Sequence, residues 1–138
     1  MVREEYLLHP IGVVESPLAE LDEAPKQGDE GAPDAWLDLH ADLDEALADV
    51  QVGSEVLVLT WLDQASRDVL TVHPRGDVER ERQGVFSTRS PHRPNPIGLH
   101  RVRVVDAEGC RLRVQNLEAV DGTPVLDIKP VLEDPGER

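Results

Sequence analysis

Residues 56–62 read Val-Leu-Val-Leu-Thr-Trp-Leu, a continuous apolar run that decides the fold class. Seven residues suit a strand, and the lack of polar alternation predicts a central strand that is covered on both faces. The run begins just after Gly53, where the pattern along the chain changes from helical to strand-like. The sequence therefore predicts a fold built around this strand.

Six further segments on either side of that run carry strand patterns. They are rich in apolar and β-branched residues and are bounded by Gly, Pro and Asp turn signals. Residues 106–109 form an acidic turn ending in Gly, which predicts a hairpin between the two segments that flank it. The predicted strands are 7–15 with a bend at Pro10 and Gly12, 36–40, 69–72, 102–105, 112–117 and 125–131.

One segment carries a helical pattern. Four apolar residues between Leu43 and Val50 recur at i, i+3, i+4 and i+7. Asp42 precedes them and Glu45 follows it three residues later, which is the arrangement of a capping box. A helix of about two turns among many short strands predicts a mainly β fold with one or two short helices, a small mixed barrel dominated by antiparallel pairing. The length of 138 residues predicts a single domain over 1–138.

Composition excludes several classes of protein. No apolar run approaches the ~18 residues that cross a bilayer, and residues 1–5 do not resemble a signal peptide, so a soluble cytoplasmic protein is expected. A lone Cys110 excludes an internal disulfide framework and a multi-thiolate zinc site. The five histidines show no ligand spacing, so no metal site is expected. Dinucleotide and phosphate-loop glycine motifs and a nucleophile elbow are also absent from the sequence.

Charge is distributed unevenly along the chain, whose net charge is −14. Residues 1–66 hold 2 basic and 16 acidic residues, whereas residues 67–103 hold 8 basic and 4 acidic residues. Five arginines and no acid occur from Arg82 to Arg103. The overall sign argues against non-specific nucleic-acid binding, while the central block is a candidate local anion site.

Residues 84–99 read GVFSTRSPHRPNPIGL and form the first candidate functional segment. Three prolines fix φ and remove backbone donors, which predicts an extended or turned loop rather than a helix or a central strand. Such a stiff loop presents side chains in fixed directions at little cost in entropy, as a preorganised ligand site does. The alternative is a stiff, solvated surface loop. The candidate ligand-binding side chains are Arg89, His92, Arg93 and Asn95.

Residues 121–130 read DGTPVLDIKP and form the second candidate segment. Beyond the Asp-Gly turn, alternation places Val125, Asp127 and Lys129 on one face of a strand, with Leu126 and Ile128 on the other. The carboxylate and the ammonium then either bind a polar ligand or form an ion pair on a solvated sheet face.

These two segments closely resemble the TrmO (TsaA-like) family. The resemblance extends to residues 9–17, His-Pro-Ile-Gly-Val-Val-Glu-Ser-Pro, and to Pro-Lys-Gln at 25–27. It implies an S-adenosylmethionine-dependent methyltransferase that modifies N6 of threonylcarbamoyl-adenosine 37 in threonine tRNA. It also implies a small single-sheet β-barrel that forms a homodimer, with the cofactor near the subunit interface.

The resemblance also implies site residues, by matching positions. Arg89 and Lys129 are candidates for binding the methionine carboxylate, Arg93 for binding substrate, and His92, Asn95 and Asp127 for orienting the acceptor or relaying its proton. The implied cofactor-binding residues are Pro25, Lys26, Gln27, Asp63, Gln64, Arg89, Leu99, Asp121, Gly122, Thr123, Pro124 and Lys129.

Two alternatives stay open at this point. The first is a methyltransferase that acts on a small molecule or a peptide. The second is a non-catalytic adenosylmethionine-binding protein.

Overall fold

The computed structural model describes residues 4–18 and 33–133. The predicted cofactor residues Pro25, Lys26 and Gln27 lie outside the described residues. The mainly β prediction is confirmed, and the short helices are all 3-10 turns. The strands are β1 (Gly12–Glu15), β2 (Ala35–Leu39), β3 (Glu55–Trp61), β4 (Thr71–Val72), β5 (Gln83–Gly84), β6 (Ile97–Glu108), β7 (Arg111–Gln115) and β8 (Pro124–Pro130). The 3-10 helices are η3 (Ala41–Leu47), η4 (Pro74–Gly76) and η5 (Val85–Ser87).

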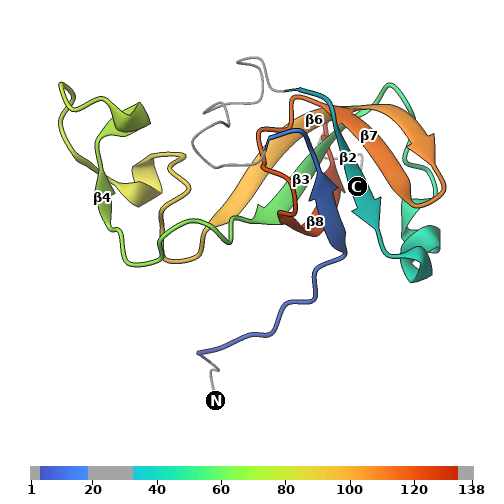
Figure 1. The fold of residues 1–138 in the computed structure, drawn as a ribbon, viewed down its shortest axis with the longest axis horizontal. Helices are drawn as coiled ribbons and strands as arrows, with labels where there is room; N and C mark the ends of the chain where they lie inside the picture. Colours follow the sequence, from blue (N-terminus) through green and yellow to red (C-terminus); the bar gives the residue numbers. More distant parts are fainter. Residues whose placement is uncertain (1–3, 19–32, 134–138) are drawn as a thin grey trace.

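Six of the strands pair in the order β1-β2-β7-β6-β3-β8 and close into a barrel (Figure 1). Every pair is antiparallel, and β1 closes the ring by pairing with β8. The long strand β6 pairs first with β3 and then with β7, so it runs from the end of the proline-rich loop to the predicted hairpin. That hairpin is confirmed, although its turn lies at Gly109–Cys110 and β6 continues through Glu108.

Alternating residues of the strands fill the barrel. The largest fully buried side chains include Leu37, Val58, Val102 and Val104, which face inward from β2, β3 and β6. The prediction that the central strand is covered on both faces is wrong for a single chain. In β3 the inward residues are buried, whereas the outward ones are only partly buried, because one face of a barrel strand points away from the core.

The predicted helix forms, but in a different conformation. It is the 3-10 helix η3, with none of its residues fully buried. The predicted capping box is wrong: His40 precedes the first turn, and no side chain caps the helix. Leu47 and Val50 still pack against the barrel core, which explains the apolar spacing.

Strand β8 departs from the predicted alternation. The register with β3 shifts between Leu59 and Thr60, so that Leu59 pairs with Asp127 and Thr60 pairs with Val125. Because of this irregularity, Val125 and Ile128 both pack on the core. The prediction that Val125 shares a face with Asp127 is therefore wrong.

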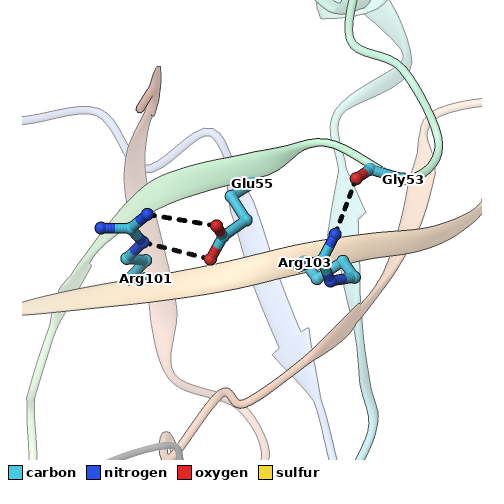
Figure 2. A network of polar contacts seen from close by, with 4 residues as sticks. All are labelled: Gly53, Glu55, Arg101 and Arg103. Atoms are coloured by element: carbon cyan, nitrogen blue, oxygen red, sulfur yellow. Dashed lines mark hydrogen bonds and ion pairs between the residues drawn. The ribbon is translucent and has the colours of Figure 1, made fainter. Parts of the chain in front are cut away.

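The outer faces of β3 and β6 are joined by charged contacts at one end (Figure 2). Arg101 donates from Nε and Nη2 to the two carboxylate oxygens of Glu55, both at 3.1 Å. Arg103 Nη1 donates to the carbonyl oxygen of Gly53 at 2.9 Å. The hydrogen bond from Arg101 lowers the pKa of Glu55 below its usual value of 4.5.

Residues 62–96 form a lobe that extends from the barrel between β3 and β6 (Figure 1). Its strands β4 and β5 pair over only two residues each. Leu62 N–H donates to the Pro96 carbonyl at 2.8 Å, so the two ends of the lobe meet where it joins the barrel. Within the described residues no helix is long and apolar enough to cross a bilayer.

Candidate functional site

An open cleft of about 1280 Å³ lies between the lobe and the first residues of β6. The proline-rich loop supplies much of its wall, from Phe86 to Leu99. The prediction that residues 84–99 contain no regular structure is wrong at both ends, because η5 begins at Val85 and β6 begins at Ile97. The part between them is an irregular loop, as the three prolines require.

The segment before the lobe's first strand braces this loop. Arg67 Nε donates to the Pro94 carbonyl at 2.7 Å, and its Nη2 donates to Asn95 Oδ1 at 2.9 Å. Ser66 N–H donates to His92 Nδ1 at 3.0 Å. These contacts join residues more than 25 positions apart, so the loop is fixed by tertiary structure and lines a cleft, rather than being only a stiff segment in solvent.

Hydrogen bonding at His92 and Asn95 limits what these two candidates can do. Since His92 Nδ1 accepts a hydrogen bond from the Ser66 N–H, the neutral ring carries its hydrogen on Nε2. His92 can therefore donate a hydrogen bond to a ligand from Nε2. The side-chain oxygen of Asn95 accepts from Arg67, which leaves its amide NH2 as a donor.

The two loop arginines differ in their contacts. Arg93 Nη1 donates to the carbonyls of Thr88 and Ser90 at 3.1 and 2.9 Å, and its guanidinium lies 6.0 Å from the Phe86 ring centre. Arg93 thus holds the loop in shape. Arg89 is exposed and makes no side-chain hydrogen bond or ion pair with the described residues, so its guanidinium is available to a ligand.

The cleft concentrates positive charge on a strongly acidic protein. Four arginines line it, Arg80, Arg82, Arg89 and Arg93, against a single carboxylate among the described lining residues, Glu118. Part of the central basic block therefore gathers at one site, whereas Arg101 and Arg103 lie on the outer face of the barrel.

A second, much smaller recess of about 20 Å³ adjoins the cleft. It is lined by Asp63 and Gln64, which follow β3, and by residues 118–120 and Thr123, which precede β8. Leu62 and Glu118 line both the recess and the cleft, so the two spaces are contiguous. The structure thus brings predicted cofactor residues from three separate parts of the sequence to one side of the barrel.

The Asp-Gly turn beside this recess is held by strand β1 and the residues after it. Ser16 N–H donates to Asp121 Oδ1 at 3.0 Å, and Asp121 N–H donates to the Leu18 carbonyl at 2.6 Å. Gly122 has a φ of 82°, a conformation that favours glycine, and its N–H donates to Val14. Thr123 is buried, and Pro124 begins β8.

Three polar side chains beneath the cleft are linked by hydrogen bonds, and the sequence did not predict this contact. His100 Nδ1 lies 2.7 Å from Glu118 Oε1, and its Nε2 lies 2.7 Å from Thr60 Oγ1. His100 and Thr60 are almost fully buried. No motif links these residues, because 40 positions separate the threonine from the histidine and 18 separate the histidine from the glutamate.

Asp127 and Lys129 are not brought to the cleft within one chain. They lie on the outer face of β8, opposite Leu59 and Leu57, and form an ion pair of 3.1 Å with each other. The predicted alternative, an ion pair on a solvated sheet face, describes their placement.

Cys110 has no feature of a nucleophile. Its Sγ lies 3.7 Å from Asp44 Oδ1, and partial burial together with the Asp44 carboxylate raises the pKa of the thiol above its usual 9.0. Among the described residues, no group of three His, Cys, Asp or Glu side chains is placed to hold a metal ion.

A comparison with a protein-family model shows to which family this chain belongs. The model described as the tRNA-methyltransferase O N-terminal domain matches residues 13–135. The chain belongs to this family. The match includes most of β1 and all of the lobe, the cleft and β8, so the TrmO resemblance of the two sequence segments is confirmed.

Curated relatives of this TrmO-domain chain are named for a cofactor. An S-adenosyl-L-methionine-binding protein of Archaeoglobus fulgidus is 48% identical over 126 residues, covering 89% of this chain and 87% of that protein. A "Probable S-adenosyl-L-methionine-binding protein" of Methanothermobacter thermautotrophicus is 43% identical over 130 residues, covering 94% and 93%. Another from A. fulgidus is 44% identical over 123 residues, and there the match spans 89% of this chain but only 33% of the relative.

Solved structures show the same fold. A crystal structure of TrmO from Pseudomonas aeruginosa has a TM-score of 0.75 at 32% sequence identity. The comparison covers 97% of this chain and 61% of the TrmO chain. The chain thus spans less than two thirds of the length of that solved TrmO.

Proposed function

We propose that this chain is an S-adenosylmethionine-dependent methyltransferase that acts on N6 of threonylcarbamoyl-adenosine 37 in threonine tRNA. One observation carries the proposal: the proline-rich loop and the residues around the Asp-Gly turn line two contiguous spaces on one side of the barrel. The relatives' names and the family agree with S-adenosylmethionine as cofactor.

The residues around these spaces fit the cofactor chemically. Arg89 supplies an uncommitted cation for the carboxylate of its methionine part. Asp63 and Gln64 are exposed at the rim of the recess and supply hydrogen-bonding groups for the adenosine part, which would lie in the cleft beside this rim because the recess itself holds only about 20 Å³. Bound there, the cofactor provides a methyl group on a positively charged sulfur.

The chain's own contribution to transfer is to hold two reactants in line. Contacts from Arg67 and Ser66 keep the loop backbone fixed before any ligand arrives. His92 Nε2 and the Asn95 amide are donors at the cleft wall that can orient an acceptor base. Such positioning supplies much of the rate when the reactive group belongs to the cofactor.

Charge around the cleft supports a nucleic-acid substrate. The lining arginines are suited to phosphate, whereas the rest of a chain with net charge −14 repels it. Docking of tRNA is then restricted to the cleft face. Because tRNA is the proposed substrate, we assign the activity to the cytoplasm.

An apolar stripe on the barrel's outer face supports a homodimer. Leu59 and Trp61 of β3 pair with Leu99 and Ile97 of β6, which are 42% and 41% exposed, and Leu57 extends the stripe along β3 beside Arg101. Leu99 and Ile97 also line the cleft. A second copy that covers this stripe would therefore border the cofactor site.

Calorimetric titration with S-adenosylmethionine tests the cofactor assignment. We expect wild type to bind, Arg89→Ala to bind roughly 10- to 100-fold more weakly, and the control Arg103→Ala to bind like wild type. No binding by wild type would contradict the proposal.

Incubation with labelled cofactor and total tRNA, followed by nucleoside mass spectrometry, tests the acceptor. We expect the label on threonylcarbamoyl-adenosine. Binding without label on tRNA would instead favour a small-molecule or peptide acceptor, or a non-catalytic binding protein.

A further inference from the structure

Glu118 occupies a special position among the residues of the site. It lies where the cleft and the recess meet, and only Leu62 shares this position with it. It is also the single carboxylate among the described residues that line the arginine-rich cleft. A ligand in the cleft that extends from Arg89 toward the rim of the recess would border this carboxylate.

A chain of contacts through two strands, β6 and β3, fixes the Glu118 side chain in place. Its Oε1 lies 2.7 Å from His100 Nδ1 on β6, and His100 Nε2 lies 2.7 Å from Thr60 Oγ1 on β3. The side chain of Glu118 is 19% exposed, whereas that of His100 is 3% exposed. The carboxylate is thus held from below by a buried imidazole while part of it still borders the open space. Charges in such a partly desolvated position interact more strongly than charges on the surface.

Gly98 makes room for this chain of contacts. A Cβ at this position would overlap Thr60 Oγ1 and would lie 2.6 Å from His100 Nε2. Strand β6 therefore has a residue without a side chain where the cleft lies over the buried imidazole.

This arrangement suits the middle of the cofactor, and the argument here rests on the proposed function. S-adenosylmethionine has an amino acid at one end, adenosine at the other and the positive sulfur between them. With the amino acid near Arg89 and the adenosine beside the exposed rim of the recess at Asp63 and Gln64, the sulfur lies between them, on the side where Glu118 borders the cleft. We propose that Glu118, oriented by His100, is the counter-anion of the sulfonium and the residue that distinguishes the cofactor from its demethylated product.

The reaction itself makes this discrimination useful. When the methyl group passes to the acceptor nitrogen, the bonding electron pair stays on sulfur and the acceptor's proton passes to solvent. The product is then a neutral thioether, which no longer has a charge to pair with Glu118. Loss of that attraction favours release of the product over retention.

Calorimetry with three ligands tests the proposal through binding alone. The ligands are S-adenosylmethionine, S-adenosylhomocysteine, which has a neutral sulfur, and sinefungin, which has an ammonium group near the same place. We expect wild type to bind the two cations at least about 10-fold more tightly than the neutral thioether. Glu118→Gln, which keeps the shape of the side chain, is expected to lose that preference while keeping its affinity for S-adenosylhomocysteine. The control Glu108→Gln removes an exposed carboxylate from the β6 end of the hairpin and is expected to match wild type.

Each remaining outcome overturns the proposal. If Glu118→Gln weakens the binding of all three ligands equally, Glu118 has only a structural role. If Glu118→Gln changes none of the three affinities, Glu118 has no role in binding the cofactor. If Glu118→Gln does not fold, the three wild-type affinities decide, because equal binding of cation and thioether contradicts the proposal. If wild type binds none of the three, the proposed cofactor is wrong and this inference is wrong with it.

Discussion

The barrel and the lobe are stabilised by different kinds of interaction. In the barrel, backbone pairing closes a ring of six strands around fully buried residues such as Leu37 and Val104. In the lobe, only β4 and β5 pair, over two residues each, and arginine side chains donate to backbone carbonyls instead. The shape of the lobe therefore depends more on hydrogen bonds from arginine side chains than on apolar packing.

This difference shows how one small chain combines stability with a binding surface. Arginines on the barrel, such as Arg101, form ion pairs with neighbouring strands on the outer face. Two lobe arginines, Arg67 and Arg93, instead fix the loop that carries Arg89, and Arg89 itself stays uncommitted among the described residues. Changes in the barrel are thus expected to affect folding, and changes in the lobe are expected to affect ligand binding.

The largest effect is expected from truncating the barrel core. Leu37→Ala removes a side chain with 0% exposure and is expected to lower the free energy of unfolding by about 2–5 kcal/mol in urea denaturation. The matched lobe variant Phe86→Ala truncates a side chain that is 82% exposed and is expected to change stability by less than about 0.5 kcal/mol. Equal losses of unfolding free energy in the two variants would contradict the distinction between an apolar barrel core and a lobe held by hydrogen bonds.

A smaller effect is expected where the two regions meet. Gly98→Ala adds a Cβ against Thr60 and His100 and is expected to cost about 1–3 kcal/mol of stability, measured in the same way. Gly84→Ala is the control, since its Cβ would meet no atom within 4 Å and its φ is −60°. A stable Gly98→Ala variant with unchanged cofactor affinity would refute the close packing beneath the cleft.

Weakening the brace inside the lobe is expected to act locally. Arg67→Ala removes two hydrogen bonds to the loop, to Pro94 and to Asn95, and is expected to cost roughly 1 kcal/mol. Limited proteolysis should cut residues 88–96 faster in this variant than in wild type, while cleavage within the barrel stays unchanged. Unchanged cleavage of the loop would show that Arg67 does not hold it.

The smallest effect concerns pH and the outer face of the barrel. Arg101 lowers the pKa of Glu55 in the folded state, so the pair stabilises the protein above the usual pKa of 4.5 and loses this contribution as the pH falls through the lowered value. Glu55→Gln is expected to melt slightly below wild type at pH 7, and the difference is expected to shrink below pH 4.5. A difference that grows with acidity would contradict this sign.

The sequence predicted the barrel better than the site. Apolar and β-branched segments bounded by turn signals indicated every barrel strand, although the first residues of β6 were assigned to the proline-rich segment. The irregularity in β8 was missed, since a register shift between Leu59 and Thr60 depends on the partner strand rather than on local pattern. The predicted cofactor-binding residues were taken from the resemblance to the TrmO family and not from the spacing of residues in the sequence. The contact of His100 with Glu118 exists only because barrel closure brings β6 beside the segment before β8, which no local motif records.

The central claim is that the proline-rich loop and the Asp-Gly turn bind one ligand together. Hydrogen–deuterium exchange with and without S-adenosylmethionine tests it most directly. The account predicts slower exchange on ligand addition in both residues 86–99 and residues 117–124, with the hairpin at residues 106–112 unchanged. Protection confined to one of the two segments, or to neither, would contradict it.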